Sequence, residues 1–157
     1  MDQPTFDSVP PWKKALAYMW YGWGLSLCYW GIRTSEQSFY RAGTNSFSHA
    51  LHFCPQLAQV YYRRGLIRGR ELRDHQAAIA DMTKAIELSP DWPNPYLQRG
   101  LFERFHGDPH AALIDLRHYL TLTEDASWRI EAENQIRMLE EELHITNKPI
   151  TETDDGG

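Results

Sequence analysis

The chain has 157 residues, which is the usual size of one folding domain with a single core. Hydrophobic residues make up 42% of the chain and charged residues 24%, a globular composition that excludes disorder throughout. Because 21 acidic residues outnumber 16 Lys and Arg, the net charge of −5 gives no support for non-specific attraction to nucleic acid, and we expect no specific nucleic-acid partner. The two cysteines form no CxxC pair and no disulfide framework, so we expect free thiols in a cytoplasmic protein.

A charge-free aromatic segment comes first along the chain. Residues 15–32 carry no charged side chain, and Lys13, Lys14 and Arg33 flank them. The segment has nearly the length of a membrane span, but its Trp, Tyr and Gly residues run through the middle, whereas spanning helices confine aromatic residues to their ends. We therefore expect a helix that is covered by protein. A helix lying on a membrane surface is the alternative, and a span is the least favoured reading.

Helical periodicity divides this segment into two apolar stripes. A helix that is apolar around most of its circumference must be covered on more than one side. We expect one stripe to pack on the core of the protein and the other to contact a second chain or a lipid surface. The first stripe comprises Leu16 and the predicted interface residues Trp20, Trp23, Leu27 and Trp30. The second stripe comprises Tyr18, Tyr21, Leu25 and Tyr29.

The rest of the chain repeats with a period of 34 or 35 residues. Residues 54–65 align with residues 89–100 at an offset of 35, with a Pro, a Tyr and an Arg-Gly pair in matching positions. Further along, Ala78 aligns with Ala112 at an offset of 34. A period near 34 with small, aromatic and proline residues in this order predicts an array of helix-turn-helix units.

This pattern resembles the tetratricopeptide repeat (TPR), whose motif has an aromatic residue, Gly, two small residues, a bulky apolar residue and Pro at fixed positions. A unit at about 58–91 matches it nearly completely, and units at about 24–57 and 93–125 match in part, as terminal units of stacked arrays usually do. The resemblance implies an all-α, right-handed α-solenoid of about three TPR-like units over residues 24–125, closed by a C-terminal capping helix. The matching residues of the middle unit are Tyr61, Gly65, Ala78, Met82, Ala85 and Pro90.

Capping residues locate the helices more closely. Asp108 followed by Pro109 starts a helix, Asn94 followed by Pro95 repeats that chemistry, and Gly107 ends the helix between them. We predict helices near 11–32, 35–52, 56–71, 74–88, 94–105, 109–122 and 126–143. They form one helical domain at 11–145, after an N-terminal extension at 1–10 and before a disordered acidic tail at 146–157.

Charged residues recur at matching positions of the units. Arg64 with Asp81, and Arg99 with Asp115, are interpreted as structural ion pairs that join the two helices of a unit, and loss of one partner of such a pair is costly. A run of five arginines between Arg63 and Arg73 is interpreted as a solvated face, with a docking site for an acidic protein segment as the alternative and a site for RNA as a less favoured one.

In TPR proteins the first helix of each unit lines a concave groove that binds peptides of partner proteins. The resemblance therefore implies a partner groove in which aromatic anchors lie beside Arg, a composition that interfaces favour. The alternative is that its apolar residues only pack on the adjoining helix. The clamp that chaperone-binding members use for a C-terminal carboxylate is not expected, because apolar residues and Tyr62 replace its Lys and Asn. The implied groove residues are Gln59, Tyr62, Leu66, Arg70, Asn94, Leu97, Leu101, Arg104 and Phe105.

Motifs for chemistry are sparse. His49, His52 and Cys54 are too few for a zinc site, and nucleotide-binding, protease and hydrolase motifs are absent. We therefore expect no metal, no cofactor and no enzymatic activity. The predicted function is an adaptor or assembly subunit that binds a protein segment in the groove and a further chain, or a second copy, through the aromatic helix. The alternative is a peripheral membrane protein anchored by residues 15–32.

Overall fold

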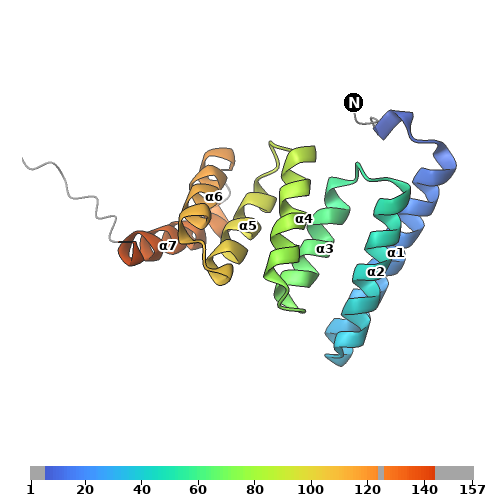
Figure 1. Ribbon diagram of the computed structural model, residues 1–157, viewed down its shortest axis with the longest axis horizontal. Coiled ribbons are helices and arrows are strands. Elements are labelled where there is room, and N and C mark those ends of the chain that lie inside the picture. The colour runs from blue at the N-terminus through green and yellow to red at the C-terminus, as the bar shows by residue number, and fades with distance from the viewer. Residues whose placement is uncertain (1–5, 124–125, 144–157) are drawn as a thin grey trace, which may run out of the picture.

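The computed structural model describes residues 6–123 and 126–143, and the tail predicted at 146–157 lies outside them. The described part contains helices and no strand. A short 3-10 helix, η1 (Phe6–Ser8), precedes α1 (Pro11–Thr34), α2 (Gln37–Phe53), α3 (Ala58–Arg70), α4 (His75–Leu88), α5 (Pro93–His106), α6 (Pro109–Leu122) and α7 (Ala126–Glu142). The helices follow one another along the long axis of the molecule, from α1 at one end to α7 at the other (Figure 1). This is the predicted all-α solenoid.

Local chemistry explains two of the predicted helix ends, at Gly107 and Asp108, and a third differs from the prediction. Asp108 caps α6 by accepting a hydrogen bond from the backbone N–H of Ala111 at 3.0 Å. Gly107 ends α5 in the left-handed conformation, with φ of 100°, which a residue without a Cβ adopts at no steric cost. The predicted cap at Asn94 is wrong, because α5 already begins at Pro93, whose fixed φ suits the first helical position.

Helices pair within each unit through small residues that face a bulky one. A Cβ added to Gly65 would lie 2.9 Å from the Met82 side chain, and one added to Gly100 would lie 3.0 Å from Leu116. Met82 and Leu116 are fully buried at 0% exposure. The glycines therefore allow the backbones of α3 and α4, and of α5 and α6, to approach closely enough to enclose these side chains.

The packing of α1 differs from the prediction, because neither stripe of large residues forms its buried face. Small residues form that face and bring α1 close to α2. Trp20 and Tyr21 lie at its edges, half-buried, where their rings approach those of His49 at 4.7 Å and Phe47 at 5.8 Å. Most other large side chains of α1 are left exposed. The buried residues of α1 are Ala17, Gly24, Cys28 and Gly31.

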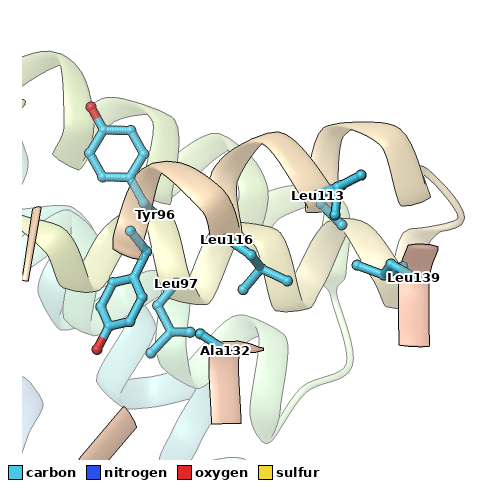
Figure 2. Close-up of a cluster of buried hydrophobic side chains, with 8 residues drawn as sticks. Tyr96, Leu97, Leu113, Leu116, Ala132 and Leu139 are labelled. Atoms are coloured by element: carbon cyan, nitrogen blue, oxygen red, sulfur yellow. The ribbon is translucent and has the colours of Figure 1, made fainter. Parts of the chain in front are cut away.

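A capping helix closes the C-terminal end of the solenoid, as predicted. Ala132 and Leu139 of α7 are fully buried in a cluster with Leu97, Leu113 and other residues of α5 and α6 (Figure 2). This contact covers the apolar surface that the last helix pair would otherwise expose to water. It also covers part of α5, which limits the surface that is open to a partner.

Arg64 joins three helices. Its Nε and Nη2 donate to the two carboxylate oxygens of Asp81 on α4, at 3.0 and 2.6 Å. Its Nη1 donates to the hydroxyl of Ser48 on α2, at 2.9 Å. Arg68 also donates to Asp81, at 2.9 Å, so two cations share one buried carboxylate.

Arg99 repeats this arrangement one unit later. Its Nε and Nη2 donate to both oxygens of Asp115 on α6, at 2.6 and 2.8 Å, and its Nη1 donates to Thr83 Oγ1 on α4, at 3.1 Å. Both ion pairs that we predicted are present. Each one ties the two helices of its unit to the preceding unit, which sequence spacing alone did not indicate.

Candidate functional site

The first helix of each of the three units, α1, α3 and α5, contributes to a surface that we call the groove face. Its central hollow, of about 290 Å³, lies between α1, α3 and the start of α5. The Tyr62 and Trp92 rings pack 4.6 Å apart at this hollow. The groove residues Gln59, Tyr62 and Asn94 therefore meet as the repeat implied. The residues lining the hollow are Tyr21, Gln59, Tyr62, Arg63, Trp92 and Asn94.

The central hollow is electropositive. Arg63 is exposed at its edge, and no described residue forms an ion pair with its guanidinium. Burial raises the pKa of the Tyr62 hydroxyl, and the nearby cations Arg70 and Arg63 oppose that rise because they favour the tyrosinate. Of these two arginines, Arg63 lines the central hollow itself, whereas Arg70 lies at the hollow near the end of α3.

A second hollow, of about 200 Å³, lies where α1 faces α3. Leu66, a predicted groove residue, lines it together with Leu25, Tyr29 and Ile32 of α1. Tyr29 and Ile32 are 57% and 67% exposed, so large apolar side chains stand open to solvent here. A third hollow, of about 250 Å³, continues the face past Tyr18 to residues 56–60.

The α1 part of this face was missed at the sequence level, although the repeat period contains it. Subtracting 34 from the numbers of Gln59 and Leu66 gives Leu25 and Ile32, because the first unit precedes the second by that offset. The stripe that contains Leu25 was instead assigned to the core or to a separate contact. In the structure it forms one wall of the groove face.

Helix α7 closes the other end of the groove face. The prediction for Leu97 is wrong: it is 2% exposed and packs in the cluster that contains Ala132 of α7 (Figure 2). Leu101 is half-buried against the same cluster, and Arg104 donates a hydrogen bond to Gln135 of α7. Three of the five groove positions on α5 therefore contact the capping helix or its cluster, whereas Asn94 and Phe105 stay exposed.

The predicted groove residues Arg70 and Phe105 line a separate hollow of about 210 Å³ near the end of α3. Arg70 donates to the buried amide oxygen of Gln98 at 2.9 Å. Phe105 is 71% exposed and stacks on His75 with 5.5 Å between the ring centroids. Arg73 also lines this hollow, so the run of arginines divides: two bind Asp81, and others face open surface.

The predicted interface of α1 is exposed in part. Trp23 and Trp30 are 59% and 55% exposed, whereas Trp20 and Leu27 are half-buried. Trp23 lines a hollow of about 430 Å³ that none of the groove residues touches. This surface is therefore separate from the groove face.

Other candidate sites gain no support. Among residues 6–123 and 126–143, no group of three His, Cys, Asp or Glu residues is arranged to hold a metal ion. His49 packs its ring against Trp20, and Cys54 is buried with its thiol 3.5 Å from Gln56 Oε1. Within the described part of the chain, no helix combines the length and apolar character needed to cross a membrane.

A family model of the tetratricopeptide repeat matches residues 58–91, the range of the predicted middle unit. The TPR domain of Arabidopsis OM64 is 23% identical, with 80% of this chain and 98% of that one covered and a TM-score of 0.69. The TPR2B domain of yeast Sti1, in a complex with pHsp70, is 18% identical, with 82% and 98% covered and a TM-score of 0.68. The first TPR of Spaghetti (RPAP3), bound to the HSP90 peptide SRMEEVD, is 20% identical, with 79% and 95% covered and a TM-score of 0.65.

At these identities the likeness to solved structures establishes a shared fold. It extends over most of this chain, whereas the sequence match covers the middle unit. The repeat period and the family model agree on the middle unit, residues 58–91. Residues 58–91 therefore match the tetratricopeptide repeat in sequence, and the chain shares its fold with solved TPR domains.

Proposed function

We propose that this chain is a non-enzymatic adaptor, or an assembly subunit of a larger complex, that binds an extended segment of a partner protein along the groove face. The observation that carries this proposal is the row of three hollows between α1, α3 and α5. They are arranged end to end over the groove face, and they share Tyr21 or Arg63 at their borders. One peptide could place successive side chains in all three.

The size and exposure of the hollows support a peptide as the ligand. Volumes of about 200 to 290 Å³ are smaller than the roughly 300–1,000 Å³ of a typical small-molecule pocket. Tyr18, Tyr29 and Ile32 are each more than half exposed around them. Contiguous apolar surface of this kind commonly marks a protein interface.

The charges along the face indicate the chemistry of the segment. Arg63, which has no ion-pair partner in the described part of the chain, lines both the central hollow and the one beside Tyr29. A partner segment with aromatic or aliphatic anchors and an Asp or Glu between them would complement this surface. Because apolar side chains stand where chaperone-binding TPR proteins carry Lys and Asn, we expect an internal segment and not a free C-terminal carboxylate as the ligand.

A second surface belongs to the same proposal. The outward side of α1, with Trp23 and Trp30 exposed, would make a contact independent of the groove. The alternative function, a TPR protein held at a membrane surface by residues 15–32, draws on the same two tryptophans. A vesicle experiment described below separates the two.

Peptide selection from a random display library tests groove binding. We expect enriched peptides to combine apolar anchors with an acidic residue, and Tyr62→Ala and Arg63→Glu each to weaken the best peptide by about tenfold or more. Ile114→Ala and Arg41→Glu, at exposed positions that line none of the hollows, are the matched controls and should leave affinity unchanged. Failure to enrich any peptide, or equal binding by all four variants, would refute the proposal.

A further inference from the structure

The outward side of α1 carries a regular apolar stripe, which we call the outer stripe. Its members recur at alternating steps of four and three residues, the spacing at which one helix contacts another along its length. Trp12, Met19, Trp23 and Trp30 are between 55% and 59% exposed. The outer stripe comprises Trp12, Leu16, Met19, Trp23, Ser26 and Trp30.

Gly22 lies beside this stripe, and none of the residues that the structure describes packs against it. The other glycines of the described helices would each place an added Cβ within 3.0 Å of a neighbouring group, so packing requires them. A Cβ added to Gly22 meets nothing within 4 Å. Gly in the middle of a helix costs about 1 kcal/mol relative to Ala, and no packing contact with the described residues offsets that cost at Gly22.

Gly22 forms the floor of the hollow of about 430 Å³ on this side of α1. Met19, Gly22, Trp23 and Ser26 line it at spacings i, i+3, i+4 and i+7, with Trp20 alongside. Four residues at these spacings form the hole that receives a side chain from a facing helix. The Ser26 hydroxyl already donates to the Gly22 carbonyl at 3.1 Å, so covering it leaves no unpaired donor.

We infer that a second copy of this chain packs against the outer stripe, with the two α1 helices antiparallel and a twofold axis beside Gly22 and Trp23. One face then carries both the hole and a protruding Trp23 next to it, as an isologous interface requires. The antiparallel arrangement places each Trp23 over the small residues Gly22 and Ser26 of the partner. A parallel pair would set small residues against small ones and leave the hollow empty, and its helix dipoles would be unfavourably aligned.

The area and charge of the stripe fit this partner. A whole tryptophan side chain has an area of about 250 Å², so the exposed parts of Trp12, Trp23 and Trp30 offer roughly 430 Å² per copy. A pair of chains would therefore bury about 860 Å² of surface through these three side chains alone. Met19, Leu16 and the surrounding rim bring the total close to the roughly 1,200 Å² at which stable interfaces begin. Residues 15–32 carry no charge, and Lys13 and Lys14 lie beside Trp12 at the end of the stripe, so the central part of the contact buries no unpaired ion.

A lipid surface fits this helix less well. Helices that lie on membranes usually carry Lys and Arg along a polar face, and α1 has none between Lys14 and Arg33. A hollow next to a protruding ring is a shape that a second helix can fill. Dimerisation here rests on the second surface of the proposed function, and it is independent of groove binding.

Sedimentation velocity of the full chain tests the inference. We expect a dimer at micromolar concentration, and we expect Gly22→Gln and Trp23→Gln each to weaken self-association by about tenfold or more. Neither residue is buried, so both variants should keep the far-UV circular dichroism of the native chain. Tyr29→Gln is the matched control: it is as exposed as the adjacent Trp30 but faces the groove, and it should remain dimeric.

Oxidative cross-linking tests the orientation. A twofold axis beside Gly22 and Trp23 sets Leu16 of one chain opposite Trp30 of the other, and within one chain these two positions are 14 residues, or about 21 Å, apart along α1. In an antiparallel pair a mixture of Leu16→Cys and Trp30→Cys chains should form a disulfide-linked dimer, and Leu16→Cys alone should not. A parallel pair would give the opposite result and overturn the arrangement.

Three further outcomes would overturn the inference. They are a chain that is monomeric at every concentration, a dimer that both stripe variants leave intact, and a monomer that binds phosphatidylcholine–phosphatidylserine vesicles through Trp23. Peptide binding by the monomeric Gly22→Gln variant tests the groove proposal separately from the dimer inference. If the groove proposal is correct, the monomer binds its selected peptides with unchanged affinity.

Discussion

Replacing Arg99 with Met should destabilise the protein more than replacing Arg64 with Met, although the two arginines occupy equivalent positions. Each makes a two-pronged ion pair with a buried aspartate and one hydrogen bond to a hydroxyl of the preceding unit. The difference is Arg68. Its Nη1 donates to Oδ2 of Asp81 at 2.9 Å. Among the described residues, by contrast, every hydrogen bond and ion pair of the Asp115 carboxylate comes from Arg99.

The magnitudes follow from what each substitution leaves behind. The side chain of Asp115 is 7% exposed, so Arg99→Met leaves a buried carboxylate without a cation, at a cost of about 3–5 kcal/mol. Arg64→Met leaves Asp81 paired with Arg68, so only charged hydrogen bonds are lost, at about 1.5–3 kcal/mol. In a chain of this size 1 kcal/mol shifts Tm by about 2–4 °C. The expected losses are therefore roughly 6–20 °C for Arg99→Met and 3–12 °C for Arg64→Met.

Urea unfolding followed by circular dichroism, with thermal unfolding in parallel, measures both variants. The double variant Arg64→Met/Arg68→Met leaves Asp81 without a cation and should cost as much as Arg99→Met. If Arg64→Met alone is as damaging as Arg99→Met, or if the double variant is no worse than Arg64→Met, Arg68 does not protect Asp81 and the reasoning fails. Selected groove peptides should bind folded Arg64→Met with native affinity.

Three other predictions follow from local contacts. Burial raises the pKa of the Cys28 thiol from 9.0 to about 11, so the folded state favours the neutral thiol. The neutral thiol therefore contributes fully to the free energy of unfolding below pH 9. That free energy should fall by up to about 2–3 kcal/mol as the pH rises to 11. Urea midpoints across this range should fall more in the native chain than in Cys28→Ala, in which Tyr40 and Tyr62 still have raised pKa values. Gly69→Ala places a Cβ 2.4 Å from the buried Phe102 ring and should cost about 1–3 kcal/mol in chemical unfolding, so an unchanged midpoint would contradict the packing. Asp108→Ala removes the hydrogen bond to the Ala111 N–H and should cost about 1 kcal/mol, whereas Asp108→Asn should retain most of that stability.

Most of the fold was predictable because it depends on residues close together in the sequence. Asp108 and Gly107 set helix ends through hydrogen bonds and backbone conformations that reach only a few residues. The period of 34 is a property of stacked units that repeat the same packing, as at Gly65 and Gly100. The misplaced cap at Asn94 differs by one residue because a second proline, Pro93, offered an earlier start.

The candidate site was less predictable, because sequence periodicity does not say which neighbour a helix face meets. Leu97 occupies a groove position in its unit, but α7 packs over it and buries it with Ala132. Helix α1 differs in the other direction, because a residue predicted to be covered is exposed within the chain. Its apolar circumference predicted two contacts, but small residues such as Gly24 and Cys28 pack against α2, and Trp23 remains exposed.

The sequence by itself determined the repeat architecture, the helix boundaries and the arginine–aspartate pairs, since each arises from local capping or from contacts repeated once per unit. Only the tertiary structure decided which surfaces stay open. In the folded chain Leu25, Tyr29 and Ile32 line the groove face, and Leu97 is buried beside α7. Gly22 lies beside the exposed ring of Trp23. The physical reason is that exposure is fixed by where the whole of a neighbouring helix lies, and that position depends on packing along the full solenoid.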